Sequence, residues 1–62
     1  MTLEEARKAI GWIVIYNPPD VRSERGVITS VSDTHVFVRY GSDGHSKATR
    51  PEDLYPHPLG GL

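Results

Sequence analysis

The sequence predicts a mainly β fold, a small five-stranded barrel with a short amino-terminal helix and a 3₁₀ turn before the last strand. Three observations support this prediction. Runs rich in β-branched and aromatic residues occur at 12–16, 26–31 and 34–40, and such runs favour strands. Polar residues suited to turns separate the last two runs. A Pro-Glu-Asp-Leu segment at 51–54 then precedes the last expected strand.

The amino-terminal helix is expected over residues 2–10. Thr2 and Glu5 have the spacing of a capping box, in which each side chain accepts a hydrogen bond from the backbone N–H of the other residue. Gly11 suits a left-handed residue at the end of the helix. Because a helix of this length is unstable alone, its apolar side should pack on the barrel. That side comprises Leu3, Ala6, Ala9 and Ile10.

The first strand is expected at Trp12–Tyr16, and it ends where Pro18 and Pro19 cannot donate to a strand ladder. A solvent-facing loop should follow over residues 17–25, of the kind that often carries recognition. The runs at 26–31 and 34–40 should pair as an antiparallel hairpin, joined by a tight turn at Ser32 and Asp33.

Alternation along the second hairpin strand places Val36 and Val38 inward, with Phe37 outside or beneath the helix. Residues 41–44 form a turn by composition. A brief fourth strand is expected at 47–49, a 3₁₀ turn opened by Pro51, and a short fifth strand at Leu54–Tyr55. The expected core comprises Val14, Val27, Val31, Val36, Val38 and Leu54.

Length and composition bound the function. The chain has 62 residues and no cysteine, so we expect one domain over residues 1–56 and a flexible tail over 57–62. A chain this short buries only about 60% of its unfolded surface, which makes a buried active-site cavity improbable. The net charge is −1 without a basic cluster, which disfavours duplex nucleic acid. The sequence contains neither a signal peptide nor a membrane span, which favours the cytoplasm.

The order of strand, loop, hairpin, short strand, 3₁₀ turn and short strand is similar to SH3-like barrels, including Tudor-type and KOW-type modules. The segment GVITSVSDTHVFVRYGSDGHSKATRPEDL also resembles a family of very small proteins encoded by bacteriophages and prophages. The resemblance covers residues 1–55 in layout and is most specific across 36–54. It implies an accessory protein in the cytoplasm of an infected or lysogenic bacterium, but it brings no established site.

The strongest candidate for ligand or partner contact is a donor-rich cluster near the fourth strand. Arginine can grip an anion with two hydrogen bonds, lysine adds a point charge, and hydroxyl groups complete such a shell. The alternative is a solvated hairpin, in which Lys47 and Arg50 pair with nearby acids. The candidate site residues are Arg39, Tyr40, His45, Lys47, Thr49 and Arg50.

Two other patterns have structural explanations that we prefer. A repeated Ser-Asp-x-His, beginning at Ser32 and at Ser42, could suggest a metal site, but Ser-Asp pairs commonly start turns and successive hairpin tips lie at opposite ends of a sheet. We therefore predict no metal. The five aromatic residues could line a peptide groove or a cage, yet a core this small needs several of them, and Trp12 is expected to be a structural plug.

These observations leave two functional hypotheses, both non-enzymatic and without a cofactor. The first is a protein-interaction module that acts on a host or phage protein. The second is an oligomer that binds or sequesters a small anionic ligand, such as a signalling nucleotide of host defence, between subunits. A thin core without disulfides favours a homo-oligomer in either case. If the donor-rich cluster is not the contact surface, the loop at 17–25 is the next candidate.

Overall fold

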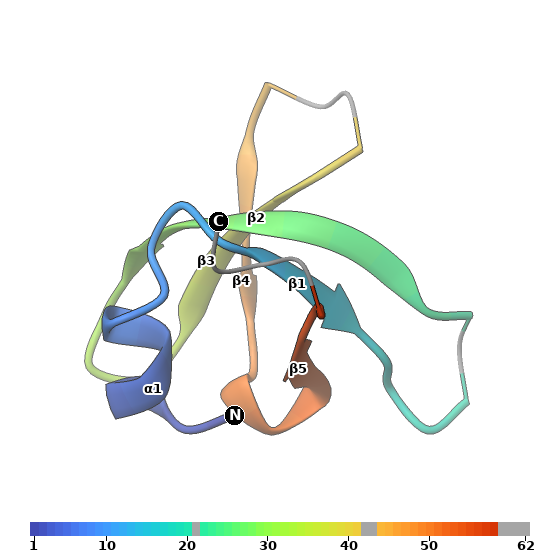
Figure 1. Cartoon of the computed structure of the whole chain (residues 1–62), viewed down its shortest axis with the longest axis horizontal. Helices are drawn as coiled ribbons and strands as arrows, with labels where there is room; N and C mark the ends of the chain where they lie inside the picture. Colours follow the sequence, from blue (N-terminus) through green and yellow to red (C-terminus); the bar gives the residue numbers. More distant parts are fainter. Residues whose placement is uncertain (21, 42–43, 59–62) are drawn as a thin grey trace.

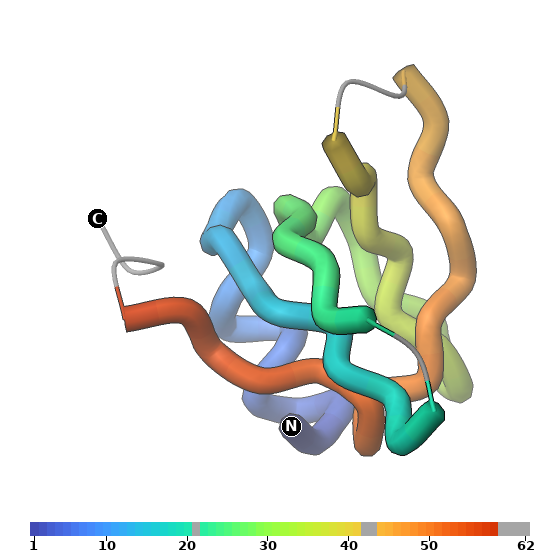
Figure 2. The backbone as a smooth tube through the Cα atoms, turned by 90° about the vertical axis from the view of Figure 1, so that its right-hand side faces the viewer, coloured from blue at the N-terminus to red at the C-terminus, as the bar shows by residue number. Residues whose placement is uncertain are grey.

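In a computed structural model, which describes residues 1–20, 22–41 and 44–58, five antiparallel strands form one sheet in the order β4-β3-β2-β1-β5. The molecule measures 25 × 23 × 22 Å, because the sheet curls around its core instead of lying flat (Figures 1 and 2). The strands are β1 (Ile13–Tyr16), β2 (Glu24–Val31), β3 (Val36–Tyr40), β4 (Ser46–Thr49) and β5 (Leu54–Pro56).

The predicted five-stranded antiparallel sheet is confirmed, as is the 3₁₀ turn η1 (Pro51–Asp53) before the last strand. Strands β4 and β5 are the two edges of the sheet. No strand pairing between them closes the sheet within the described residues, so the complete barrel stays a prediction. Within the same residues, no helix is long and apolar enough to cross a membrane.

The amino-terminal helix α1 (Leu3–Arg7) is shorter than predicted. Its capping box is confirmed: the Glu5 N–H donates to Thr2 Oγ1 at 3.1 Å, and the Thr2 N–H donates to Glu5 Oε1 at 2.8 Å. After Arg7 the chain continues in tight turns with hydrogen bonds three residues apart, which end at Gly11 with a φ of 89°. The turns leave Ile10 51% exposed, so its predicted place on the packed side is wrong.

The core lies on the concave side of the sheet, beneath α1. Four predicted core residues are fully buried there, namely Val14, Val36, Val38 and Leu54. Ala6, Ala9, Ile28 and Tyr40 complete the buried apolar cluster.

The prediction for β2 is wrong in its inward face. Ile28, not Val27, is buried, because Val27 pairs with Ile13 and Arg39 on the outer face. The register shifts between Ile28 and Ser30, and such a bulge reverses the alternation beyond it. Val31 consequently returns to the inner side, where it is half-buried against the core.

The β2–β3 turn is held by Ser32, as a Ser-Asp turn predicts. The Ser32 hydroxyl accepts from the N–H of Thr34 at 3.2 Å and from that of His35 at 3.0 Å. At the other end of the sheet, residues 42 and 43 of the second predicted turn lie outside the described residues. Of the predicted tail, the His57 N–H donates to the Ile13 carbonyl at 3.3 Å, and residues 59–62 lie outside the description.

Candidate functional site

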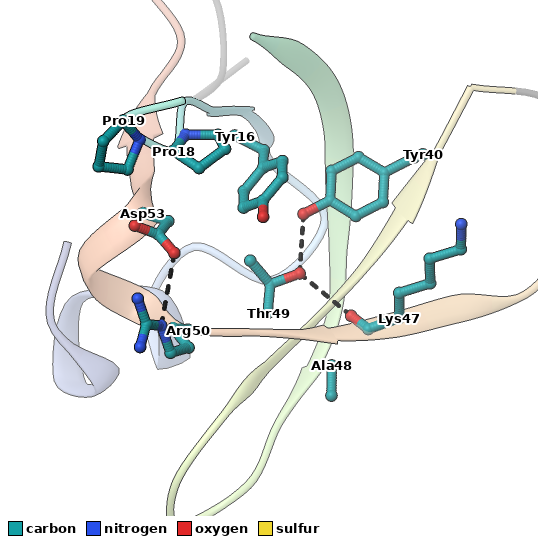
Figure 3. Close-up of a pocket in the computed structure, with 9 residues that line it drawn as sticks. All are labelled: Tyr16, Pro18, Pro19, Tyr40, Lys47, Ala48, Thr49, Arg50 and Asp53. Carbon is teal, nitrogen blue, oxygen red and sulfur yellow. Dashed lines mark hydrogen bonds and ion pairs between the residues drawn. The ribbon is translucent and has the colours of Figure 1, made fainter. Parts of the chain in front are cut away.

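A surface groove of about 430 Å³ lies between the loop that follows β1 and the segment formed by β4 and η1 (Figure 3). One wall carries two tyrosines and two prolines, and the other carries the end of β4, Arg50 after it and Asp53 at the end of η1. The groove is lined by Tyr16, Pro18, Pro19, Tyr40, Lys47, Ala48, Thr49, Arg50 and Asp53.

The two tyrosine rings form a tilted pair at one side of the groove. Their centroids are 5.7 Å apart and their planes meet at 56°. Strand alternation brings them together, since Tyr16 follows Val14 on the concave side of β1 and Tyr40 follows Val38 on the concave side of β3. Both rings lie beside the groove (Figure 3). Tyr16 is half-buried and Tyr40 is buried, and each ring combines an apolar face with a polar hydroxyl group.

Gly26 makes room for this pair on the strand between them. It lies opposite Tyr40 in the β2–β3 register. A Cβ atom at this position would lie 2.5 Å from Val38 Cγ1 and 2.8 Å from Tyr40 Cδ1. The Tyr40 ring therefore covers the backbone of Gly26, and a side chain there would push it out of place.

A chain of hydrogen bonds supports the floor of the groove. The Tyr40 hydroxyl lies 2.8 Å from Thr49 Oγ1, and Thr49 Oγ1 donates to the Lys47 carbonyl at 3.3 Å. Since a hydroxyl carries one hydrogen, Tyr40 donates to Thr49 in this arrangement. Burial raises the pKa of Tyr40, the Thr49 bond opposes the shift, and the charges of neighbouring acids add to it.

The charged residues of the groove have both signs. Arg50 Nε lies 3.5 Å from Asp53 Oδ2, with the Arg50 side chain 67% exposed and that of Asp53 only 14% exposed. Lys47 extends along the same side of β4 as Tyr40 (Figure 3). Glu24 is near enough to Tyr40 to contribute to its raised pKa. The groove therefore combines an apolar wall with a mixed, partly paired set of charges.

The structure brings four of the six predicted site residues together on the groove, namely Tyr40, Lys47, Thr49 and Arg50. Arg39 lies on the outer face, as alternation with Tyr40 requires, beside a second hollow of about 240 Å³. His45 is exposed in the turn before β4 and lines neither hollow. A partner that covers the groove alone would miss both residues.

Sequence reasoning did not identify Tyr16, Pro18, Pro19 and Asp53 as parts of this site. A signal existed for Tyr16, because it shares the alternation of buried Val14. Pro18 and Pro19 begin the loop that was the second candidate surface, and the fold merges part of that loop with the first. Their meeting depends on contacts between distant segments, which no local pattern reveals.

Within residues 1–20, 22–41 and 44–58, no three His, Asp or Glu side chains cluster as metal ligands. Asp43, a member of the repeated Ser-Asp-x-His pattern, lies outside the described residues. Trp12, the predicted plug, is 41% exposed, so this prediction is wrong; it lies at the start of β1, outside the core cluster. Comparisons with protein-family models, curated proteins and solved structures found no match.

Proposed function

We propose that this protein is a non-enzymatic binding module that holds an extended segment of a partner protein in the groove. The observation that supports this most directly is the pair of tyrosine rings, 5.7 Å apart, which form an apolar wall of the groove together with two prolines. Aromatic-lined grooves of this kind suit extended peptides, because flat rings offer apolar area with little loss of conformational freedom.

The strand order and the 3₁₀ turn between β4 and β5 support an SH3-like barrel as the scaffold of this module. The resemblance of its central segment to small phage proteins supports a host or phage protein, in the bacterial cytoplasm, as the partner. An accessory protein of this kind would adapt or inhibit its target by occupying a short linear segment of it.

The alternative is a small anionic ligand bound between subunits of a homo-oligomer. Lys47 and Arg50 on one side of the groove favour it. Asp53, whose carboxylate pairs with Arg50, and Glu24 nearby oppose it, since a compact polyanion would meet two like charges. The mixed charge of the groove therefore fits a peptide better than a nucleotide.

Selection from a display library of short random peptides tests the proposal. Selected peptides should bind the purified protein and perturb the NMR signals of Tyr16, Tyr40 and Thr49. Charge reversal by Lys47→Glu with Arg50→Glu should abolish this binding and leave the fold intact, since the Arg50 side chain is exposed and surface ion pairs contribute at most about 1 kcal/mol to stability. Arg7→Glu with Lys8→Glu, two exposed cations at the end of α1 that do not line the groove, is the matched control and should bind normally.

Failure to select any peptide that perturbs the groove would overturn the proposal. Light scattering that shows an oligomer, together with a nucleotide recovered from the purified protein by mass spectrometry, would favour the anionic-ligand alternative. A double variant that unfolds would assign Lys47 and Arg50 to the fold instead of to binding.

A further inference from the structure

The two edges of the sheet differ in how their outward backbone groups are bonded. At β5 the His57 N–H donates to the Ile13 carbonyl, so Tyr55 and His57 direct their backbone groups toward β1. Leu54 and Pro56 therefore direct theirs outward, since successive residues of a strand alternate. The Leu54 N–H donates to the Pro51 carbonyl, the Leu54 carbonyl accepts from the Met1 nitrogen at 2.8 Å, and Pro56 has no N–H. This edge is nearly closed.

The orientation of β4 follows from bonds on the other side of the sheet. Ile28 directs its backbone toward β1, because its N–H donates to Trp12 and its carbonyl accepts from Gly11. Val27 then faces β3 and bonds its register partner Arg39. Arg39 therefore faces β2, and by alternation its neighbour Val38 faces β4.

Val38 is the register partner of Lys47, and Val36 is that of Thr49. The backbone groups of Lys47 and Thr49 therefore bond to β3, whereas those of Ser46 and Ala48 point away from the sheet. By this alternation the N–H and carbonyl groups of Ser46 and Ala48 take no part in the β3–β4 ladder, and among the described residues no backbone bond of a turn, loop or cap engages them. The edge of β4 is thus open at Ala48, which lines the groove, and at Ser46, two residues before it.

We propose that the open edge of β4 accepts an extended strand of the partner protein, which adds to the sheet through the backbone groups of Ser46 and Ala48. Strand addition is a common way in which an exposed sheet edge binds a peptide. This inference rests on the proposed function and specifies it. Every second side chain of the added strand would lie on the concave side of the sheet, next to Lys47 and Thr49. Those side chains would enter the groove beside Tyr40.

The chemistry of the partner segment follows from this placement. Its residues opposite Ser46 and Ala48 must keep their N–H groups, which excludes proline there. Its groove-facing side chains, at alternate positions, should be apolar or aromatic to match Tyr16, Tyr40, Pro18 and Pro19. The side chains between them would face outward beside Ala48, whose methyl group points away from Tyr40 (Figure 3).

A second copy of this chain fits the edge less well. If β4 paired with itself across a twofold axis, the side chains brought over the concave row would be Lys47 and Thr49 of the second copy. A second lysine would then join Lys47 on the concave side, beside a groove that also carries Arg50, and like charges on neighbouring strands destabilise a sheet. The apolar wall formed by the tyrosines and prolines would gain no apolar partner.

Amide hydrogen exchange, measured by NMR with a peptide selected from the random library, tests the inference. The amides of Ser46 and Ala48 should exchange rapidly in the free protein and slow by at least about tenfold in the complex. The amides of Lys47 and Thr49, already bonded to β3, serve as internal controls and should change little. Unchanged exchange at Ser46 and Ala48, in a complex that still perturbs Tyr40, would overturn strand addition and leave the groove proposal standing.

The variant Ala48→Pro removes one outward N–H while every bond to β3 remains, and edge strands tolerate proline at such a position. It should weaken peptide binding by at least about fivefold, the effect of one lost hydrogen bond. Ala48→Val, which keeps the N–H, is the control for the change of side chain at this groove-lining position, and it should weaken binding less than Ala48→Pro. If both variants fold and bind like the wild type, strand addition is wrong.

Further outcomes also decide whether a partner strand binds the β4 edge. Protection of Ser46 and Ala48 that grows with protein concentration in the absence of peptide would identify a second copy as the occupant and overturn the inference. If Ala48→Pro unfolds, Ser46→Pro, which removes the other outward N–H, carries the same expectation. If no selected peptide perturbs the groove, the proposed function and this inference fall together.

Discussion

The hydroxyl of Tyr40 lies 2.8 Å from Oγ1 of Thr49, in a buried hydrogen bond that joins β3 to β4 under the groove. The two residues are not register partners, since Thr49 pairs with Val36. The bond therefore reaches diagonally along the ladder and fixes the Tyr40 ring over the edge strand. It couples the stability of the sheet to the shape of the candidate site.

Removal of the acceptor, Thr49 Oγ1, should destabilise the protein more than removal of the donor, the Tyr40 hydroxyl. Thr49→Val leaves a buried hydroxyl unsatisfied and should lower the free energy of unfolding by about 1–3 kcal/mol, against about 1 kcal/mol for Tyr40→Phe. The double variant should lose less stability than the sum of the two single losses, because both substitutions remove the same hydrogen bond. Urea unfolding measures all three, with the exposed Ser23→Ala as the control. Strict additivity would show that the bond contributes nothing.

Gly26 should tolerate no side chain. A methyl group there would meet Val38 Cγ1 at 2.5 Å and Tyr40 Cδ1 at 2.8 Å, with the Arg39 carbonyl oxygen at 3.0 Å. We expect Gly26→Ala to lower the free energy of unfolding by about 1–3 kcal/mol, as overpacking does, and to displace the Tyr40 ring.

Gly44→Ala is the matched control for this substitution. Nothing lies within 4 Å of a Cβ atom at Gly44. It should leave stability unchanged or raise it slightly, by restricting the unfolded chain. Equal effects at Gly26 and Gly44, measured by thermal unfolding, would contradict the close packing of Tyr40 on β2.

Local patterns predicted most of the fold because its turns and caps have specific residue requirements. The capping box at Thr2 and Glu5 and the 3₁₀ turn at Pro51 each follow from a few adjacent residues. The face of β2 was predicted incorrectly because the bulge between Ile28 and Ser30 reverses the alternation in mid-strand. Val27, Ile28 and Val31 are all apolar, so their pattern alone does not reveal where that reversal occurs.

Half of the candidate site could be predicted from the sequence. Lys47 and Thr49 share one face of β4 by simple alternation, and Tyr40 lies on the adjoining strand, so a cluster there could be expected. Tyr16 and Pro18 join the same groove only because β1 and β3 lie on either side of β2 in the folded sheet. That arrangement depends on pairing between distant segments, which the sequence specifies through the whole fold and not through a motif.

The capping box should contribute to stability although α1 has only five residues. Thr2→Ala removes the acceptor of the Glu5 N–H and should lower the free energy of unfolding by about 1 kcal/mol. Thr2→Ser keeps the acceptor and should be close to neutral. Urea unfolding compares the two variants, and equal losses would show that the side-chain bond is unimportant. Because no residue of α1 lines the groove, peptide binding should be unaffected.

Alkaline pH should weaken the fold through Tyr40. Burial is the main reason that the pKa of Tyr40 is raised above 10.0, and Tyr16, Glu24 and Asp53 add to the shift. A folded pKa above the unfolded one means that the native state holds the proton more tightly. The stability that this provides is fully present below about pH 10 and is lost as the pH rises through the folded pKa.

Urea unfolding at a series of pH values from about 9 to about 11 should therefore show a steeper loss of stability in the wild type than in Tyr40→Phe, which has no proton to lose at this position. Tyr55→Phe is the control, since Tyr55 is 49% exposed and its removal should leave the slope unchanged. The near-ultraviolet absorbance of tyrosinate should include a late-titrating signal in the wild type that is absent from Tyr40→Phe. If Tyr40→Phe keeps the wild-type slope, burial at the floor of the groove does not raise the pKa of Tyr40.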